Sequence, residues 1–431
     1  MSNSYPIVFV HGVLGWGRAE FVGFPYFGFA KWGTLLGKIS LGEAFFEEIL
    51  FGEISFEEII NLLRGLHRRA LFPSVGPISS HHDRACELFY QLKGGNVYYG
   101  DDHSKDYKHL AVIRDWEKGK HPLYKKWDEE HPVHLVGHSQ GAPTIRKLQE
   151  LLNNRFFIDT ETGETYQTND RWIKSITTIS GVNNGSLATY LLGCDPSSGF
   201  VTENSTAWHL TKILTSISER EQKDFVWEFF NKYIYNLDLE QWRDSHNRIN
   251  FEDFIRGDED KGGDNCVYDL SLHGTQAFNA NSQDYPNTYY FSYLTSQTQP
   301  TDDSTGHQVA KYLMNPVLQT TADGIGEYPC HEQDKLTNLI AEIDDYSKWR
   351  ENDGLVSVYS QEYPRDPRRD NYKTQQRFYL PGDELKPGIW YVMRKLEMDH
   401  LDIVMFPESR EQVHKQLEFY SGLYRLLAEL D

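Results

Sequence analysis

The chain has 431 residues, a length that suits either one large α/β domain with insertions or two ordinary domains. Its 43 Lys and Arg residues against 63 Asp and Glu residues give a net charge of −20, which argues against binding to nucleic acid and against electrostatic docking on anionic lipid. This charge leaves contact with a neutral lipid surface open. A hydrophobic share of 39% supplies a large core and excludes global disorder.

The predicted strands and helices alternate along the chain. Four segments are short, apolar and rich in β-branched or aromatic residues, as buried strands are: 6–10, 133–136, 173–179 and 288–294. Helical patterns lie between and after them: 84–93, 144–153 and 410–429. Strands that alternate with helices favour a mainly parallel sheet covered on both faces.

Two amphipathic regions interrupt this alternation. Residues 40–70 hold two amphipathic stretches around a glycine-containing break, which predict a helical insertion near the edge of the sheet. Residues 205–235 carry apolar side chains at helical spacing: Trp208, Leu210, Ile213, Leu214 and Ile217. Such a stripe most often faces the core, and a mobile lid is the alternative. We expect one domain over residues 1–431 with these insertions.

The cysteines and the apolar segments bear on the compartment. Four widely spaced cysteines without a CxxC pair do not form a disulfide framework: Cys86, Cys194, Cys266 and Cys330. No apolar run reaches about 18 residues, so we expect no transmembrane helix. Residues 1–4 lead straight into an apolar segment without a signal peptide, so the chain as written is expected to be cytoplasmic.

A G-x-S-x-G pentapeptide at Gly137–Gly141 predicts a nucleophilic serine. It directly follows the buried segment 133–136 and directly precedes a helical pattern, which is the strand–turn–helix setting of a nucleophile elbow. In such a turn Ser139 is exposed to substrate, and the backbone N–H of Gln140 points to where an oxyanion forms. The alternative is a glycine-flanked surface turn with an idle serine.

A second oxyanion donor is expected in the loop after the first strand. There the chain reads His11-Gly12-Val13, and an HG step followed by a non-glycine residue suits an oxyanion loop with the Val13 N–H as donor. A glycine-rich turn without a catalytic part is the alternative.

A nucleophilic serine needs a base and an acid that orients the base. In the order serine, acid, histidine, the preferred base is His400, in the last quarter of the chain. The preferred acid is Asp353, in an Asn-Asp-Gly turn, over Asp399, because a neighbour one residue away rarely faces the same ring nitrogen. An Asx-turn aspartate and a surface histidine are the alternative.

Asp83, His103 and His109 form a cluster of metal-ligand residue types, with the two histidines six residues apart in a polar stretch. Asp269 is a more distant candidate. Two histidines and two aspartates would complete a closed tetrahedral zinc site, a composition that suits a structural metal. Rival ligands lie close by: His81, His82, Asp101, Asp102 and Asp106.

These segments together resemble the zinc-containing thermophilic bacillar true lipases, a branch of the bacterial triacylglycerol lipases, and their lipase-like relatives in plants. The matching segments span nearly the whole chain: Pro6–Gly17, Gly76–Tyr99, Gly137–Gly141, Pro286–Tyr293, Glu351–Leu355 and Asp399–Leu401. The Gly-Trp-Gly after HG and the strings DRACE and NTYYFSY are specific to this group.

The resemblance implies an α/β-hydrolase fold, a mainly parallel sheet with helical cap or lid insertions and a zinc-bound subdomain. The family's nucleophile falls on Ser139, its acid on Asp353 and its base on His400. The oxyanion donors fall on Val13 and Gln140.

The family's zinc ligands fall on Asp83, His103, His109 and Asp269, with the order and the short spacings intact. The resemblance therefore implies a structural zinc ion that ties the zinc-binding segment 83–109 to the chain around Asp269.

Three departures from the family pattern stand out. His82 replaces a tryptophan that shields the metal in the family. Calcium often binds after the catalytic histidine in this family, and Asp402 matches one of its acids, but residues 405–407 do not supply the second. The insertion 40–70 is longer than in the bacterial lipases, and the lid region 205–235 matches them poorly.

We therefore expect a carboxylic-ester hydrolase, most closely a triacylglycerol lipase that works through an acyl-enzyme. Alternatives are an esterase, phospholipase or acyltransferase that uses the same triad, or a non-catalytic lipid- or ligand-binding module. The expected partners are a lipid or small ester substrate and a transient lipid–water interface, with no nucleic acid and no stable protein partner.

Overall fold

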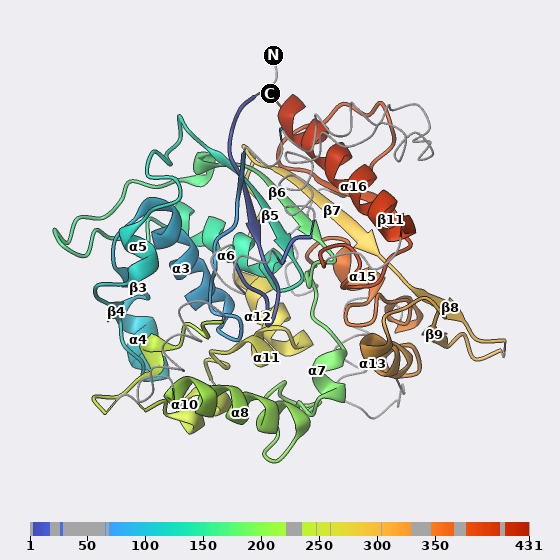
Figure 1. Ribbon diagram of the computed structural model, residues 1–431, viewed down its shortest axis with the longest axis horizontal. Helices are drawn as coiled ribbons and strands as arrows, with labels where there is room; N and C mark the ends of the chain where they lie inside the picture. The colour runs from blue at the N-terminus through green and yellow to red at the C-terminus, as the bar shows by residue number, and fades with distance from the viewer. Residues whose placement is uncertain are drawn as a thin grey trace.

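A seven-stranded sheet crosses the protein in the computed structural model, in the order β10-β11-β7-β6-β5-β1-β2 (Figure 1). The structure describes residues 3–17, 26–28, 65, 69–220, 235–246, 248–258, 260–302, 304–328, 346–365, 376–405 and 410–430. The strands of the sheet are β1 (Ile7–Val10), β2 (Ala70–Leu71), β5 (Val133–His138), β6 (Ile173–Ile179), β7 (Tyr289–Thr295), β10 (Gln376–Phe378) and β11 (Trp390–Leu396). Every neighbouring pair is parallel, which confirms the predicted sheet.

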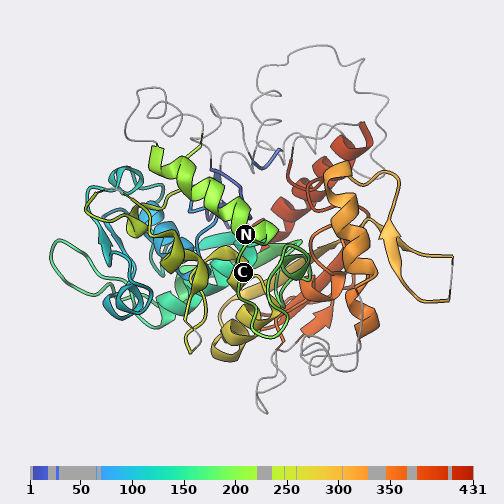
Figure 2. The same ribbon diagram turned by 90° about the horizontal axis from the view of Figure 1, so that it is seen from below.

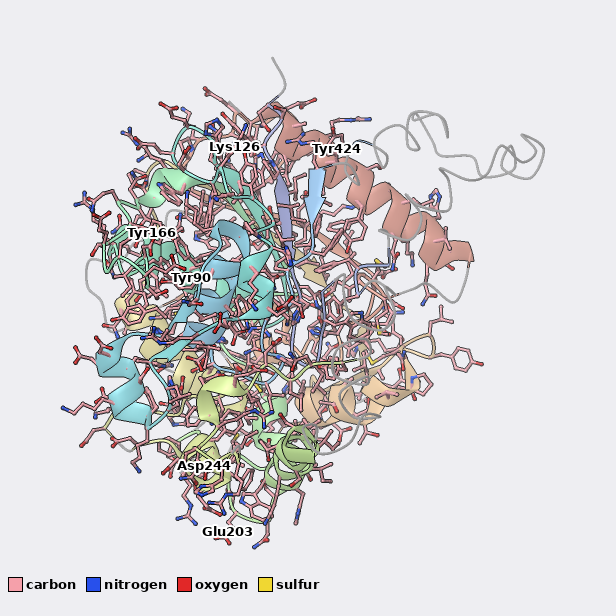
Figure 3. The ribbon with its side chains drawn as sticks, turned by 60° about the vertical axis from the view of Figure 1, so that its left-hand side comes forward. Tyr90, Lys126, Tyr166, Glu203, Asp244 and Tyr424 are labelled. Carbon is pink, nitrogen blue, oxygen red and sulfur yellow. The ribbon has the colours of Figure 1, made fainter. Side chains whose placement is uncertain are left out.

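Helices cover both faces of the sheet. Successive residues of β1 point to opposite faces, so Ile7 and Phe9 enter one apolar cluster and Val8 and Val10 the other. The first cluster is completed by α16 (Arg410–Glu429), and the second by α3 (His81–Lys93) and α6 (Gly141–Asn153). Figure 3 shows the two layers from the side, with Tyr90 on α3 and Tyr424 on α16 on opposite sides of the sheet.

The remaining helices gather mostly below the carboxyl ends of the strands in Figure 1. They are α4 (Asp101–Tyr107), α5 (Glu117–Lys120), α7 (Ala188–Leu191), α8 (Thr206–Arg220), α10 (Phe251–Arg256), α11 (Cys266–Asp269), α12 (Leu272–Asn281), α13 (Pro316–Gly326) and α15 (Val358–Gln361). Two antiparallel pairs complete the fold: β3 (Val97–Tyr98) with β4 (Val112–Ile113), and β8 (Thr298–Pro300) with β9 (Gln308–Ala310).

The predicted helix in region 205–235 is confirmed as α8, which lies across the face seen from below in Figure 2. Its apolar stripe does not all face the core. Trp208 is buried, whereas Leu210 is 44% and Ile213 57% exposed. The rest of that region, residues 221–234, and almost all of the predicted insertion 40–70 lie outside the described residues.

The predicted absence of a disulfide framework agrees with three buried free thiols, those of Cys86, Cys194 and Cys266, while Cys330 lies outside the described residues. Within the described part of the chain, no helix has the length and apolar character needed to cross a membrane.

Two glycines let α6 approach the sheet closely. A Cβ atom at Gly141 would lie 2.2 Å from the carbonyl oxygen of Val10, and one at Gly137 would lie 2.4 Å from that of Gly141. Both distances are much shorter than a van der Waals contact. The atoms that would be hit belong to the backbone and cannot move independently. The helix therefore begins directly against β1 and β5, at the turn that holds Ser139.

We predict that Gly141→Ala destabilises the protein by about 2 kcal/mol or more, because the new methyl group forces α6 away from β1. Gly422→Ala is the matched control, since a Cβ atom there meets nothing within 4 Å on helix α16. We expect this control to be stabilising by about 0.5 to 1 kcal/mol. Urea unfolding monitored by circular dichroism measures both, and equal stability of the two variants would contradict the close approach.

Candidate active site and metal centre

Ser139 lies in a strained turn between β5 and α6. Its φ angle is 55°, in the left-handed region that a non-glycine residue rarely adopts. The turn is fixed by the bond from the Ser139 N–H to the Ile179 carbonyl (3.1 Å) and by the Ala142 N–H, which donates to the Ser139 carbonyl. The side chain lies against the loop after β1, because a Cβ atom at Gly12 would be 3.2 Å from Ser139 Oγ.

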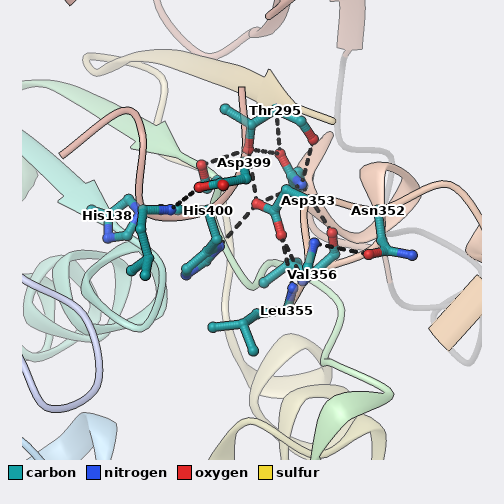
Figure 4. Close-up of polar contacts among 12 residues, drawn as sticks. His138, Thr295, Asn352, Asp353, Leu355, Val356, Asp399 and His400 are labelled. Carbon is teal, nitrogen blue, oxygen red and sulfur yellow. Dashed lines mark hydrogen bonds and ion pairs between the residues drawn. The ribbon is translucent and has the colours of Figure 1, made fainter. Parts of the chain in front are cut away.

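Asp353 and His400 meet directly at the carboxyl ends of the strands (Figure 4). His400 Nδ1 donates to Asp353 Oδ2 at 2.9 Å, which leaves His400 Nε2 free of this bond and able to act as a base. The same oxygen accepts from Thr295 Oγ1 (2.8 Å) and Gln361 Nε2 (3.2 Å). Its partner Oδ1 accepts from the backbone amides of residues 355 and 356. Five donors thus fix the orientation of this buried carboxylate.

His138, the residue before the serine, supports the histidine loop. Its Nε2 donates to the carbonyl of His400 at 3.0 Å, and its Nδ1 accepts from the hydroxyl of Tyr26 at 2.8 Å. Burial and the nearby His400 hold the pKa of His138 well below its ordinary value, so the ring is neutral. Sequence reasoning missed this residue, and the one signal for it was its place inside the pentapeptide.

Asp399, the rejected candidate for the acid, has other partners. Its Oδ1 accepts from the amides of Leu401 and Asp402, and its Oδ2 accepts from the Asn315 amide at 2.7 Å. This carboxylate therefore ties the loop around His400 to the start of α13. Of the two aspartates, Asp353 is the one on the histidine ring.

Among the described residues, the Val13 and Gln140 N–H groups donate to no protein acceptor, as oxyanion donors require. Gln140 stands at the N-cap of α6, where the helix dipole favours negative charge. Both residues flank Ser139, one from its own turn and the other from the loop after β1.

A second polar cluster brings together Asp83, His103, His109 and Asp264, whose ligand atoms all lie within 4.8 Å of one another. His103 Nε2 is 3.3 Å from Asp83 Oδ1 and 3.4 Å from Asp264 Oδ1, and His109 Nε2 is 3.3 Å from Asp264 Oδ2. Two histidines and two aspartates form a donor set that suits zinc in a closed site.

Unpartnered atoms in the cluster point to a metal. Asp83 Oδ1, His103 Nε2, His109 Nε2 and Asp264 Oδ2 are all buried without a hydrogen bond. The outer atoms have partners: His109 Nδ1 donates to the Leu110 carbonyl (3.0 Å), and Asp83 Oδ2 accepts from Gln241 Nε2 (2.8 Å). These outer bonds aim the lone pairs inward, so the residues present fit a divalent cation.

The prediction of Asp269 as the fourth ligand is wrong in this structure, because Asp264 occupies that place. Asp264 precedes the short helix α11 and Asp269 ends it, so the two carboxylates leave the helix at different ends. Asp269 Oδ2 accepts from the backbone N–H of His81 at 2.6 Å. The rival ligands are also outside the cluster: His81, His82, Asp101, Asp102 and Asp106.

The carboxylates and imidazoles of this cluster shift one another's pKa values. Burial lowers the pKa of His103, but the carboxylates of Asp264 and Asp83 outweigh it and raise this pKa to about 10. The pKa of His109 also rises against burial, because of the same two carboxylates. Burial raises the pKa of Asp264, but His103 and His109 lower it by more, so this pKa falls below its ordinary value. Metal binding would therefore release protons.

His82 keeps an aromatic ring beside the metal ligands where the related family has tryptophan. Its ring stacks on His103 with centroids 3.8 Å apart, and its Nε2 hydrogen-bonds the Tyr99 carbonyl at 2.7 Å. The ring of His82 therefore covers one side of His103.

Among the described residues, Asp402 belongs to no group of three or more side chains that could hold a metal ion. The Asp402 carboxylate accepts from the Asp399 N–H and from the Gln412 side chain, so protein donors occupy its oxygens. Burial raises the pKa of both Asp399 and Asp402, the latter to about 6.

We predict that Asp264→Asn lowers zinc affinity by about 100-fold or more, because it removes a charged ligand, whereas the matched change Asp269→Asn lowers it far less. Competition with a chromophoric chelator measures both affinities. A larger loss in the Asp269 variant would contradict the ligand set found here. Chelation of the wild type should also lower the thermal midpoint, since a metal ion in this cluster would tie residues 83–109 to residue 264.

The chain is similar to known lipases in its sequence. The family described as "Lipase-like, C-terminal domain" matches residues 55–430. The sequence is similar to a lipase of Staphylococcus hyicus, with 29% identity over 445 residues that cover 100% of this chain and 58% of that protein. The chain spans about half the length of the curated relatives it matches.

Solved structures of bacterial lipases and an EstA protein are also similar to this chain. The chain is similar to the S. hyicus lipase (TM-score 0.69, 25% identity, 99% of this chain and 96% of that chain). It is also similar to EstA from Clostridium botulinum (0.66, 28%, 99% and 88%) and to lipase 1 from Pelosinus fermentans (0.64, 27%, 100% and 100%). These relatives confirm the expected resemblance to bacterial lipases and the α/β-hydrolase fold.

Proposed function

Because this chain belongs to the lipase-like C-terminal domain family, we propose that it hydrolyses carboxylic esters through Ser139, His400 and Asp353. The observation that carries the proposal is the 2.9 Å bond from His400 Nδ1 to Asp353 Oδ2. The His400 loop is bonded to His138, the neighbour in sequence of Ser139, whose φ angle is 55°. A strained serine, an oriented base and two free amides form the constellation that acyl transfer requires.

The reaction has two halves. His400 Nε2 takes the proton of Ser139 as its Oγ attacks the ester carbonyl, and the oxyanion rests on the Val13 and Gln140 N–H groups. His400 then gives this proton to the leaving alcohol. In the second half His400 activates water, which attacks the acyl-enzyme, and Ser139 leaves with a proton as the acid is released. Asp353 fixes the imidazole tautomer and stabilises the imidazolium in both halves.

Within the ester class we propose a long-chain acyl substrate such as a triacylglycerol. Exposed Leu210 and Ile213 on α8 support this choice, since they offer apolar contact to a lipid surface beside the catalytic end of the sheet. The net charge of −20 favours a neutral lipid over an anionic one. The names of the relatives, lipases and an Est-type protein, agree with the ester class.

The metal centre is proposed to be structural and to bind zinc. Its four protein ligands, Asp83, His103, His109 and Asp264, fill a tetrahedral shell, so no position is open for substrate or water. In this role the ion would stabilise the fold and take no part in ester hydrolysis, which is proposed to depend on Ser139.

We predict that Ser139→Ala lowers kcat on p-nitrophenyl esters by on the order of 10³-fold or more, because the nucleophile is lost while the binding site remains. Ser175→Ala is the control, since Ser175 is a buried serine of β6 whose hydroxyl bonds His134 at 2.7 Å, away from the site. Initial rates on short and long acyl chains test the proposal. A Ser139 variant that retains most of the activity would overturn the mechanism, and a strict preference for short chains would replace lipase with esterase.

A further inference from the structure

Arg84 is a buried cation without a carboxylate partner. The residue is fully buried, and its guanidinium donates to three neutral acceptors: the His11 carbonyl, the Gly76 carbonyl (2.8 Å) and Thr144 Oγ1 (3.0 Å). In the part of the chain that the structure describes, no carboxylate oxygen lies within 4 Å of it. Burial lowers the pKa of Arg84, and the charge of Glu87 offsets this only in part. A buried charge bonded only to neutral acceptors is costly, so its contacts should explain why it is there.

The bond from Arg84 to the His11 carbonyl connects it to the loop that contains Val13. The His11 ring accepts from the Val75 N–H at Nε2 (3.2 Å), so its proton is on Nδ1, which donates to the Gly12 carbonyl at 2.9 Å. That carbonyl belongs to the same peptide unit as the Val13 N–H. Accepting a bond on the oxygen strengthens the donor on the nitrogen. Arg84 binds the carbonyl of His11 itself, so it anchors the residue that makes this polarising contact.

The bond from Arg84 to Thr144 connects it to Gln140. Arg84 Nε donates to Thr144 Oγ1, and the same hydroxyl donates to the Gln140 carbonyl at 2.8 Å. The Gln140 side chain in turn donates to the carbonyl of Ser79 at 2.8 Å. Ser79 is five residues before Arg84 in the chain. One guanidinium therefore connects both backbone segments that flank Ser139 and carry the two free amides.

We propose that Arg84 is a positioning residue that sets the two oxyanion donors, Val13 and Gln140, at the distance and direction that the transition state needs. The proposal rests on the hydrolytic function proposed above and assigns to Arg84 no contact with substrate. Its fixed positive charge behind both donors also favours the negative charge that develops there.

The test is Arg84→Met in the full-length protein, with kcat and KM measured on one p-nitrophenyl ester. Misplaced oxyanion donors weaken only the transition state, so kcat should fall by about 10- to 100-fold with KM within about threefold. A trifluoromethyl ketone with the same acyl chain gives a second readout. Ser139 Oγ adds to its carbonyl carbon, the serine proton passes to His400, and the carbonyl oxygen becomes the oxyanion. Its inhibition constant should rise by the same factor as kcat falls.

Arg146→Met is the matched control, because Arg146 is a buried arginine of α6 that donates to Asn279 and Ser282, away from both donors. Its kcat should stay within about twofold of wild type even if its thermal midpoint falls. Zinc content is measured in both variants, since Arg84 adjoins Asp83. Equal kcat and inhibitor affinity in the two arginine variants would overturn the assignment.

Thr144 keeps the proposal testable if Arg84→Met does not fold. Thr144→Val breaks the link to Gln140 at almost constant volume and should lower kcat and inhibitor affinity together, whereas Thr144→Ser keeps the hydroxyl and should restore most of the loss. No change in Thr144→Val would contradict the proposal.

The wild type separates the two claims. If it neither hydrolyses esters nor reacts at Ser139, both the proposed function and this inference fail. If it is active and the Arg84 and Thr144 variants are unaffected, only the inference fails.

Discussion

The site depends on one constraint, the left-handed backbone of Ser139 between β5 and α6. That conformation is unfavourable for serine and persists because the turn is pinned on both sides, by β6 through the Ile179 carbonyl and by α6 through the Ala142 N–H. Gly137 and Gly141 remove the side chains that would keep the helix away from β1. The loop after β1 lies against the serine at the same place, so the packing of α6 on β1 brings together the proposed nucleophile and the proposed oxyanion loop.

The rest of the site is built on loops that this framework holds in place. Asp353 accepts from five donors: two amides of its own turn, Thr295 at the end of β7, Gln361 of α15 and the ring of His400. These bonds fix its orientation. His138 links the serine turn to the histidine loop through the His400 carbonyl. The proposed catalytic groups thus come from distant parts of the chain and are linked by hydrogen bonds at one end of the sheet.

Much of this was predictable, because local patterns encode it. Buried strands and the G-x-S-x-G turn are short-range signals, and the parallel sheet follows from their alternation with helices. The pairing of Asp353 with His400 was predicted from chain order and turn type. The metal ligand was misassigned because Asp264 and Asp269 flank one short helix, and only its orientation decides which carboxylate faces the histidines. His138 and Arg84 were missed because their roles are contacts between residues far apart in sequence. The apolar stripe on α8 predicted the core only in part, since Trp208 is buried and Leu214 packs against the core, whereas Leu210 and Ile213 are exposed.

The central claim is that Ser139 is an activated nucleophile. The most direct measurement is labelling of the wild-type protein with a fluorophosphonate, followed by peptide mass spectrometry. Attack by Ser139 Oγ on phosphorus displaces fluoride, so the account predicts a single adduct on the peptide that contains Ser139, formed in a one-to-one ratio with protein. Loss of that adduct in Ser139→Ala would complete the result. An unlabelled native protein, or an adduct on another residue, would contradict the account.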